Sequence, residues 1–253
     1  MKIFISPAKS LDFENQSSIK DATQPYFENE IIRISEVLKK KSVQSLAKLL
    51  NISNDLAHLN YQRYQNFTWP TQNGESKQAL FAFTGDVYRG IDSQTLTDEQ
   101  VNRLQSHLII LSGLYGVLRP LDLILPYRLE MGTKIKIGHS PNLYAFWKNK
   151  ITPKLADEVS ENNLLVNLAS VEYAKVIDFK KLKGTLITPI FKDFKNGQLK
   201  VIQFFAKKAR GMMVRYLSQT ENPDLDYILQ FNADGYAYSP KDSENQLTPV
   251  FIR

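Results

Sequence analysis

The segment LSGLYGVLRPLDLILPYRLEMG, from Leu111 to Gly132, follows a short apolar run and combines three glycines, two prolines, two arginines and two carboxylates. So many turn-forming residues do not fit one regular helix or strand, and the segment is too apolar for a solvated linker. We therefore expect a shaped loop that lies over a core and directs a few polar groups outward. Arg119 and Arg128 are the most prominent of these groups.

The sequence on both sides of this segment alternates between strand and helix patterns. Apolar runs predict strands at 2–5, 78–83, 108–111 and 164–168, and weaker strands at 235–238 and 248–252. Helical spacing predicts helices at 26–41, 97–107, 142–159 and 206–218, with a kink or break at Pro153. Asn196-Gly197 lies between β-prone runs at 186–194 and 198–205, which is a strong hairpin signal.

This order of elements favours a mixed α/β (α+β) fold, in which a mixed sheet is flanked by helices. The chain contains no repeat, no low-complexity tract and no convincing linker. We therefore expect one domain over residues 1–253, with a helical insertion at about 26–65.

Within this insertion, residues 46–64 predict two helices around the turn Asn51-Ile52-Ser53. The pattern is similar to a helix-hairpin-helix, whose Gly-apolar-Gly turn presents backbone N–H groups to a DNA phosphate. Asn51 and Ser53 replace both glycines here, but Asn tolerates positive φ and Ser53 can cap the second helix. An anion contact at this turn and an ordinary pair of short helices both remain open.

The composition is that of a soluble globular protein, with 43% hydrophobic and 23% charged residues among 253. No apolar run approaches the roughly 18 residues that a membrane helix needs. The first ten residues, MKIFISPAKS, contain too few consecutive apolar residues for a signal peptide, and cysteine is absent. These features predict a cytoplasmic protein with no membrane contact.

The net charge of +6 is concentrated in one window. Between Lys175 and Arg215 there are eleven basic residues and only two acidic ones, Asp178 and Asp193, which gives this window a net charge of +9. Local basicity indicates a polyanion or a phosphate-bearing partner, although a solvated lysine-rich face is the alternative. The densest part lies on the predicted helix 206–218 and comprises Lys207, Lys208, Arg210 and Arg215.

Polar side chains follow the predicted strands at the points where the strands end. They are Ser6 and Lys9, then Asp86 and Tyr88, then Tyr115, and finally Ser170 and Tyr173. Because functional groups of α/β folds gather at strand ends, we expect these loops to line one cleft, together with Arg119, Arg128 and Glu130. Each loop taken alone also fits a plain tight turn.

Known cofactor and metal patterns are absent from the sequence. There is no GxxxxGK[ST], GxGxxG, GxSxG or HExxH motif, and His58, His107 and His139 lie far apart. We predict no cofactor and no metal site.

Several of these segments together resemble the YaaA family of peroxide-stress (peroxide resistance) proteins. They are ISPAK at 5–9, FTGDVYRG at 83–90, the segment 111–132, LYAFW at 143–147, NLASVEY at 167–173 and KKARGMMVR at 207–215. The resemblance implies a cytoplasmic bacterial protein of the hydrogen peroxide response that lowers free iron and limits oxidative damage to DNA. It also implies DNA binding through a positively charged cleft and a helix-hairpin-helix-like element. It brings no established reaction and no catalytic residue, and the turn without glycine departs from the family's pattern.

Three functions follow as hypotheses. The first is a non-enzymatic protein that binds DNA, mainly through its phosphates, with Lys9, Arg119, Arg128, Lys207, Lys208, Arg210 and Arg215 as contacts. The second is an enzyme that acts on a nucleotide or another phosphorylated small molecule, with Asp86 or Glu130 as proton carrier. The third is direct iron sequestration, for which the sequence offers no ligand spacing. No protein partner is identified.

Overall fold

The computed structural model describes residues 1–15, 17, 19–71 and 75–253. Its α-helices are α1 Glu28–Lys39, α2 Val43–Leu50, α3 Asn54–Gln65, α4 Ala79–Ala82, α5 Asp86–Ile91, α6 Asp98–His107, α7 Leu143–Ala156, α8 Val171–Ala174, α9 Gln203–Leu217 and α10 Leu225–Leu229. Its strands are β1 Lys2–Ile5, β2 Ser10–Leu11, β3 Lys77–Gln78, β4 Phe83–Thr84, β5 Leu108–Ser112, β6 Gly116–Leu118, β7 Leu123–Ile124, β8 Leu164–Asn167, β9 Thr185–Ile187, β10 Ile190–Lys195, β11 Gln198–Lys200, β12 Ala237–Tyr238 and β13 Val250–Ile252. The fold is therefore mixed α/β, as predicted.

The larger sheet is organised around β1, whose Ile3, Phe4 and Ile5 are buried. Its strand order is β6-β5-β1-β8-β9. The neighbouring strands β5, β1, β8 and β9 are parallel to one another, and the edge strand β6 is antiparallel to β5. A continuous apolar run suits a central strand that is covered on both faces. Because β1, β5 and β8 are parallel, their carboxyl ends meet at one edge of the sheet.

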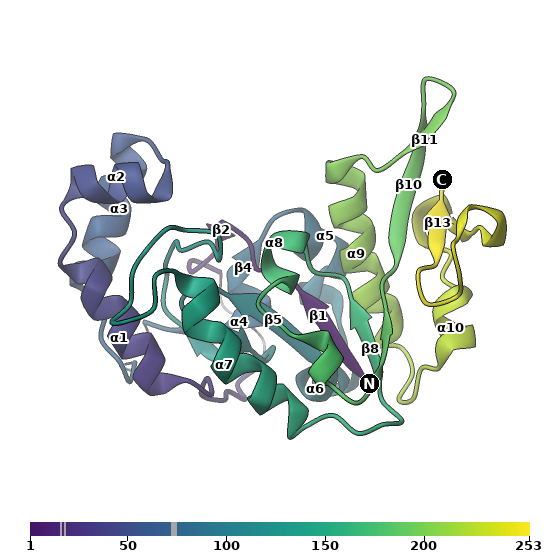
Figure 1. Cartoon of the computed structure of the whole chain (residues 1–253), viewed down its shortest axis with the longest axis horizontal. Coiled ribbons are helices and arrows are strands. Elements are labelled where there is room, and N and C mark those ends of the chain that lie inside the picture. Colours follow the sequence, from purple (N-terminus) through teal and green to yellow (C-terminus); the bar gives the residue numbers. More distant parts are fainter. Residues whose placement is uncertain (16, 18, 72–74) are drawn as a thin grey trace.

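The smaller sheet has the order β11-β10-β13-β12 and holds the predicted hairpin. Asn196 and Gly197 both adopt positive φ, at 53° and 74°, as a tight two-residue turn requires. β10 pairs with β11 on one side and in parallel with β13 on the other. In Figure 1 the hairpin extends well beyond the end of α9.

The helices α1, α2 and α3 form an arm at one end of the molecule (Figure 1). Asn51 ends α2 at φ 51° and ψ 59°, and the Ser53 hydroxyl accepts a hydrogen bond from the Leu56 backbone N–H that caps α3. The helical insertion and the conformation of its turn agree with the sequence. The likeness to a helix-hairpin-helix and its contact with DNA stay predictions.

A close crossing of α5 and α9 joins the two halves of the chain. Gly90 of α5 and Gly211 of α9 are buried at this crossing. A Cβ atom on Gly211 would lie 1.8 Å from the carbonyl oxygen of Val87, and one on Gly90 would lie 2.1 Å from that of Lys208. Only glycine allows the two backbones to approach this closely.

Three predicted elements differ in the structure. The predicted strand 78–83 is mostly the helical turn α4, because the N–H groups of Ala79 and Leu80 bond the carbonyls of Asp122 and Pro120 in the central loop. A short apolar run does not distinguish a strand from a buried helical turn. The predicted strand 198–205 ends at Lys200, and α7 continues through Pro153 to Ala156. None of the described helices is long and apolar enough to cross a membrane.

We predict that Gly211→Ala destabilises the protein by about 1–3 kcal/mol, because the added methyl group overpacks a backbone contact. In an ordinary helix the same change stabilises by roughly 0.5–1 kcal/mol, so the sign of the effect is diagnostic. Urea unfolding measures it. The exposed Gln203→Ala on α9 is the control and should change stability by less than about 0.5 kcal/mol. An unchanged or increased stability of Gly211→Ala contradicts the close crossing.

Candidate functional site

A cavity of about 390 Å³ lies at the carboxyl ends of β1 and β8. Its walls come from residues 6–10, 84–88 and 168–173, and α9 closes one side. It brings together these residues singled out in the sequence: Ser6, Lys9, Asp86, Tyr88, Glu130, Ser170, Tyr173, Lys207 and Arg210. We call this cavity the strand-end cleft.

Hydrogen bonds between the loops hold the cleft in shape. Ser6 Oγ accepts a hydrogen bond from the Ser170 backbone N–H at 2.9 Å and donates one to Ser170 Oγ at 3.2 Å. The Tyr88 hydroxyl donates to the Ser6 carbonyl at 3.2 Å. Burial raises the pKa of Tyr88 and of Tyr173 well above the usual 10, so both phenols stay protonated at neutral pH. These groups position the loops and carry no charge.

Glu130 is held between two cations at the rim of the cleft. Its Oε1 lies 2.9 Å from Lys9 Nζ and 3.9 Å from Arg128 Nη2. Arg128 lines a smaller adjoining hollow with Lys9 and Glu130, and its buried Nε has no hydrogen-bond partner among the described residues. The cluster therefore carries one more positive charge than negative.

The other two carboxylates of the cleft also have partners. Asp86 is paired with Arg89, which lies three residues later on α5. Glu172 Oε1 accepts a hydrogen bond from the Gly132 backbone N–H at 2.8 Å. Asp86 is thus neutralised by a residue outside the cleft lining, whereas Glu130 is shared between Lys9 of the lining and Arg128 outside it. Glu172 forms no ion pair with another described residue.

Lys207 and Arg210 are the cations of the cleft lining that are not paired with one of its carboxylates. Lys207 is exposed, and neither side chain forms an ion pair or a hydrogen bond within the described ranges. Arg210 is partly buried, and this burial lowers the pKa of its guanidinium, with no described carboxylate nearby to oppose the effect. A partly buried cation without a counter-ion is energetically costly and is typical of a site that receives an anion.

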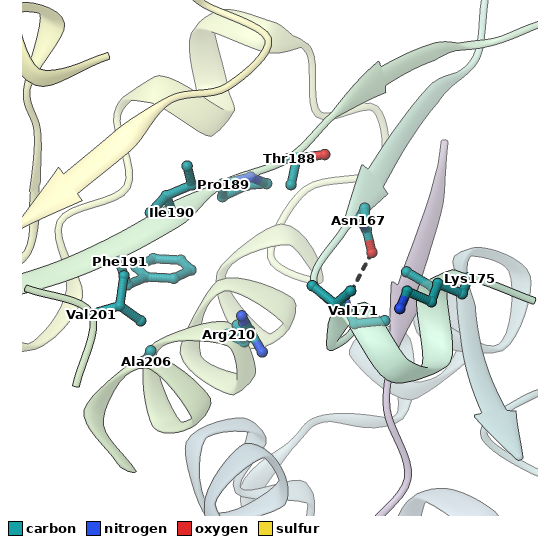
Figure 2. A pocket seen from close by; sticks show the side chains of 12 residues that line it. Asn167, Val171, Lys175, Thr188, Pro189, Ile190, Phe191, Val201, Ala206 and Arg210 are labelled. Carbon is teal, nitrogen blue, oxygen red and sulfur yellow. Dashed lines mark hydrogen bonds between the residues drawn. The ribbon is translucent and has the colours of Figure 1, made fainter. Parts of the chain in front are cut away.

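A second cavity of about 320 Å³ adjoins the cleft, and Arg210 lines both. It is bounded by residues 167–175, 188–191, 201, 206 and 210, where the larger sheet meets the smaller one. Figure 2 shows Arg210 between Phe191 and Val201 on one side and Val171 and Lys175 on the other. We call this the inter-sheet cavity.

Tyr115 and Arg119 do not belong to the cleft, contrary to the sequence-based expectation. Tyr115 is fully buried, and its hydroxyl accepts a hydrogen bond from the Leu125 N–H at 2.8 Å. Arg119 Nη2 lies 2.8 Å from Oδ1 of Asp122, whose side chain is 0% exposed. The buried carboxylate needs a counter-ion, so Arg119 turns into the loop instead of toward a ligand.

Lys208 and Arg215 line neither the cleft nor the inter-sheet cavity and have partners elsewhere, and their contact with an anion stays a prediction. Lys208 Nζ lies 3.3 Å from Asp234 Oδ2. Arg215 Nη1 donates to the carbonyls of Ile91 and Asp92 at 2.9 and 3.0 Å, where it satisfies backbone groups at the end of α5. Their helix contributes to the cleft through Lys207 and Arg210 instead.

Asn51 and Ser53 lie on the helical arm and line neither cavity. An anion contact at this turn stays a separate prediction. Within the described ranges, no group of three His, Asp or Glu side chains could hold a metal ion.

A family model described as peroxide stress protein YaaA matches residues 1–242. The chain belongs to this family. A relative named "UPF0246 protein" in Shewanella amazonensis is 48% identical over 255 residues, which cover 100% of this chain and 99% of the relative. Relatives with the same type of name in Flavobacterium psychrophilum and Alteromonas mediterranea are 48% and 47% identical over 253 and 247 residues. They cover 100% and 97% of this chain, and 100% and 95% of their own lengths. The family description connects the chain with peroxide stress.

The inter-sheet cavity was not predicted from the sequence. Its polar residues Asn167 and Thr188 end up beside Arg210 only because two sheets meet there. The one available signal was Thr188-Pro189, which interrupts an apolar run and separates β9 from β10. Glu172 belongs to the segment 167–173 that follows β8, but its bond to Gly132 has no counterpart in the sequence pattern.

We predict that Arg119→Ala lowers stability by about 3 kcal/mol, because it leaves the buried Asp122 unpaired. Burial already raises the pKa of the Asp122 carboxyl despite the adjacent guanidinium. Thermal and urea unfolding measure the loss. Arg89→Ala removes an exposed ion pair and should cost less than about 1 kcal/mol. If Arg119→Ala kept full stability and weakened anion binding, Arg119 would belong to the site after all.

Proposed function

We propose that this protein acts in the cytoplasm, where it binds DNA through the strand-end cleft and helps to limit iron-dependent DNA damage during peroxide stress. The observation that carries the proposal is the partly buried Arg210, which has no counter-ion among the described residues and lies beside Lys207 in the cleft. A phosphate supplies the missing negative charge and can accept two parallel hydrogen bonds from a guanidinium.

The charge around the cleft also supports a polyanionic partner. The segment from Lys175 to Arg215, which includes Lys207 and Arg210, carries eleven basic and two acidic residues. Lys195 and Lys200 are exposed on the hairpin of β10 and β11, which extends beyond α9 in Figure 1. Such a surface attracts nucleic acid with little dependence on base sequence. DNA contacts are therefore proposed to be mainly to phosphates.

The iron component of the proposal follows from the same phosphate contacts. Lysine and arginine side chains that neutralise phosphates release the cations condensed on DNA. Ferrous ions held there would be released with them, and peroxide would then generate fewer hydroxyl radicals next to the DNA. This account combines the family's connection with peroxide stress with the proposed DNA contacts.

We predict that affinity for duplex DNA falls steeply as salt concentration rises. The double substitution Lys207→Ala/Arg210→Ala should reduce the slope of log K against log salt by about one for each lost phosphate contact. Fluorescence anisotropy at several salt concentrations measures it. Lys183→Ala is the matched control, because Lys183 is exposed near the opposite ends of the strands. An affinity that does not change with salt contradicts the proposal.

In a bacterium that lacks its own copy, we expect the wild-type protein and Lys183→Ala to restore survival after hydrogen peroxide. Lys207→Ala/Arg210→Ala should fail to restore it, because the phosphate contacts are missing. Survival and DNA strand breaks are measured at equal protein levels. Full protection by the double variant would separate the stress function from the cleft.

An enzyme that acts on a nucleotide or another phosphorylated small molecule is the second candidate. The cleft volume of about 390 Å³ favours it, because small-molecule sites begin at about 300 Å³. Glu130 and Asp86 line the cleft and are the candidate proton carriers. The two candidates differ in one measurable property, the turnover of a bound molecule.

A further inference from the structure

We propose that Arg210 is the centre of a binding site for a single nucleotide. Its phosphate lies against Arg210 in the strand-end cleft, and its base enters the inter-sheet cavity. The nucleotide is either free or an unpaired unit of a DNA strand. The second source rests on the proposed function, whereas the free nucleotide does not.

Charge selects the phosphate for the Arg210 end of the site. Asp86 is paired with Arg89, and Glu130 is shared between Lys9 at 2.9 Å and Arg128 at 3.9 Å. Together with Glu172, which also lines the cleft, these three cations and three carboxylates carry no net charge. The positive charge of Arg210, and of Lys207 on the preceding turn of α9, therefore remains uncompensated. A monoanion or dianion of a phosphate ester fits this excess better than a neutral ligand does.

Apolar side chains select a flat, weakly solvated group for the other end. Phe191 and Ile190 form one part of the inter-sheet wall, and Val171 and Val201 form another. Val171 is 72% exposed and Val201 is 44% exposed, so core packing does not explain either residue. A nucleobase placed between these groups would remove their apolar surface from water.

Polar groups in the same cavity can address the edge of a base. Asn167 Oδ1 accepts a hydrogen bond from the Ala169 N–H at 3.1 Å. The two N–H donors of the Asn167 side-chain amide are not used in this bond. Asn167 and Thr188 both line the cavity, and neither these donors nor the Thr188 hydroxyl has a hydrogen bond to another described residue. An amide and a hydroxyl offer both donors and acceptors, which is what a base edge requires.

Size restricts the ligand to one nucleotide. The two cavities measure about 390 and 320 Å³ and share the Arg210 side chain. Volumes in this range hold a small molecule, whereas a base pair within a duplex would have to remain outside. A nucleotide of a strand can enter only if it is unpaired or turned out of the stack.

The test is isothermal titration of the full chain with deoxyadenosine 5′-monophosphate, inorganic phosphate and deoxyadenosine. We expect saturable binding of the monophosphate, about 10-fold or more tighter than either part alone, because both cavities are then filled. Arg210→Gln should weaken the monophosphate about 10-fold or more, since a charged hydrogen-bond donor is lost. Val201→Trp should obstruct the inter-sheet cavity and weaken the monophosphate while leaving phosphate binding unchanged. Lys183→Gln is the charge-matched control and should bind as the wild type does.

The strand source is tested with a duplex that carries one unpaired adenine and with its fully paired counterpart. Tighter binding of the unpaired adenine, lost in Val201→Trp, supports the site even if the free monophosphate does not bind. The site is overturned if neither ligand depends on Arg210 and Val201. Salt-dependent duplex binding would then still support the proposed function. Binding of the monophosphate without any DNA binding would sink the proposed function and leave the nucleotide site in place.

Discussion

The backbone contact between Gly90 and Gly211 is the constraint on which the candidate site depends. It brings α9 against α5, and so carries a late part of the chain to the loops that follow β1 and β8. Arg215 strengthens the same contact by bonding carbonyls at the end of α5. One turn before Gly211, the same helix presents Lys207 to the cleft, and Arg210 lies directly beside the crossing. A shift of this contact would move the cations away from the strand ends.

The central loop 111–132 supports the site mainly from within. Ser112 and Tyr127 share a buried hydrogen bond of 2.7 Å, and Trp147 Nε1 donates to the Gly113 carbonyl at 2.9 Å. The Tyr64 hydroxyl from the helical arm bonds the carbonyl of Arg128. The loop thus connects the arm, α7 and the sheet, and only its last residues approach the cleft. Its density of turn residues reflects internal hydrogen bonding more than ligand contact.

Much of the site's location could be predicted, because it follows from the parallel strands. The apolar runs of β1, β5 and β8 are readable from the sequence, and parallel strands bring their carboxyl ends together. The partners of individual cations could not be predicted in this way. Arg119 and Arg210 look alike in sequence, but the fold places a buried carboxylate beside the first and none of the described carboxylates beside the second. The inter-sheet cavity depends on the docking of two sheets, which no local pattern encodes.

The stretch 78–83 illustrates the same limit at the level of secondary structure. Its apolar residues fit a buried strand, but carbonyls of the central loop accept the N–H groups of Ala79 and Leu80 and leave room for one helical turn. By contrast, the predicted helix 97–107 is found as α6, whose N-cap Thr97 exchanges capping bonds with Gln100 within four residues. Local interactions were therefore predictable, whereas the partners of individual groups on distant segments were not.

The uncompensated charge of Arg210 also bears on how this protein tolerates change. Burial disfavours the charged guanidinium of Arg210. An apolar residue of similar length would therefore stabilise the folded state at least as well. Selection for thermal stability alone would tend to replace Arg210. Stabilised variants obtained without a functional screen should accumulate neutral substitutions at this position, in line with the general conflict between stability and activity.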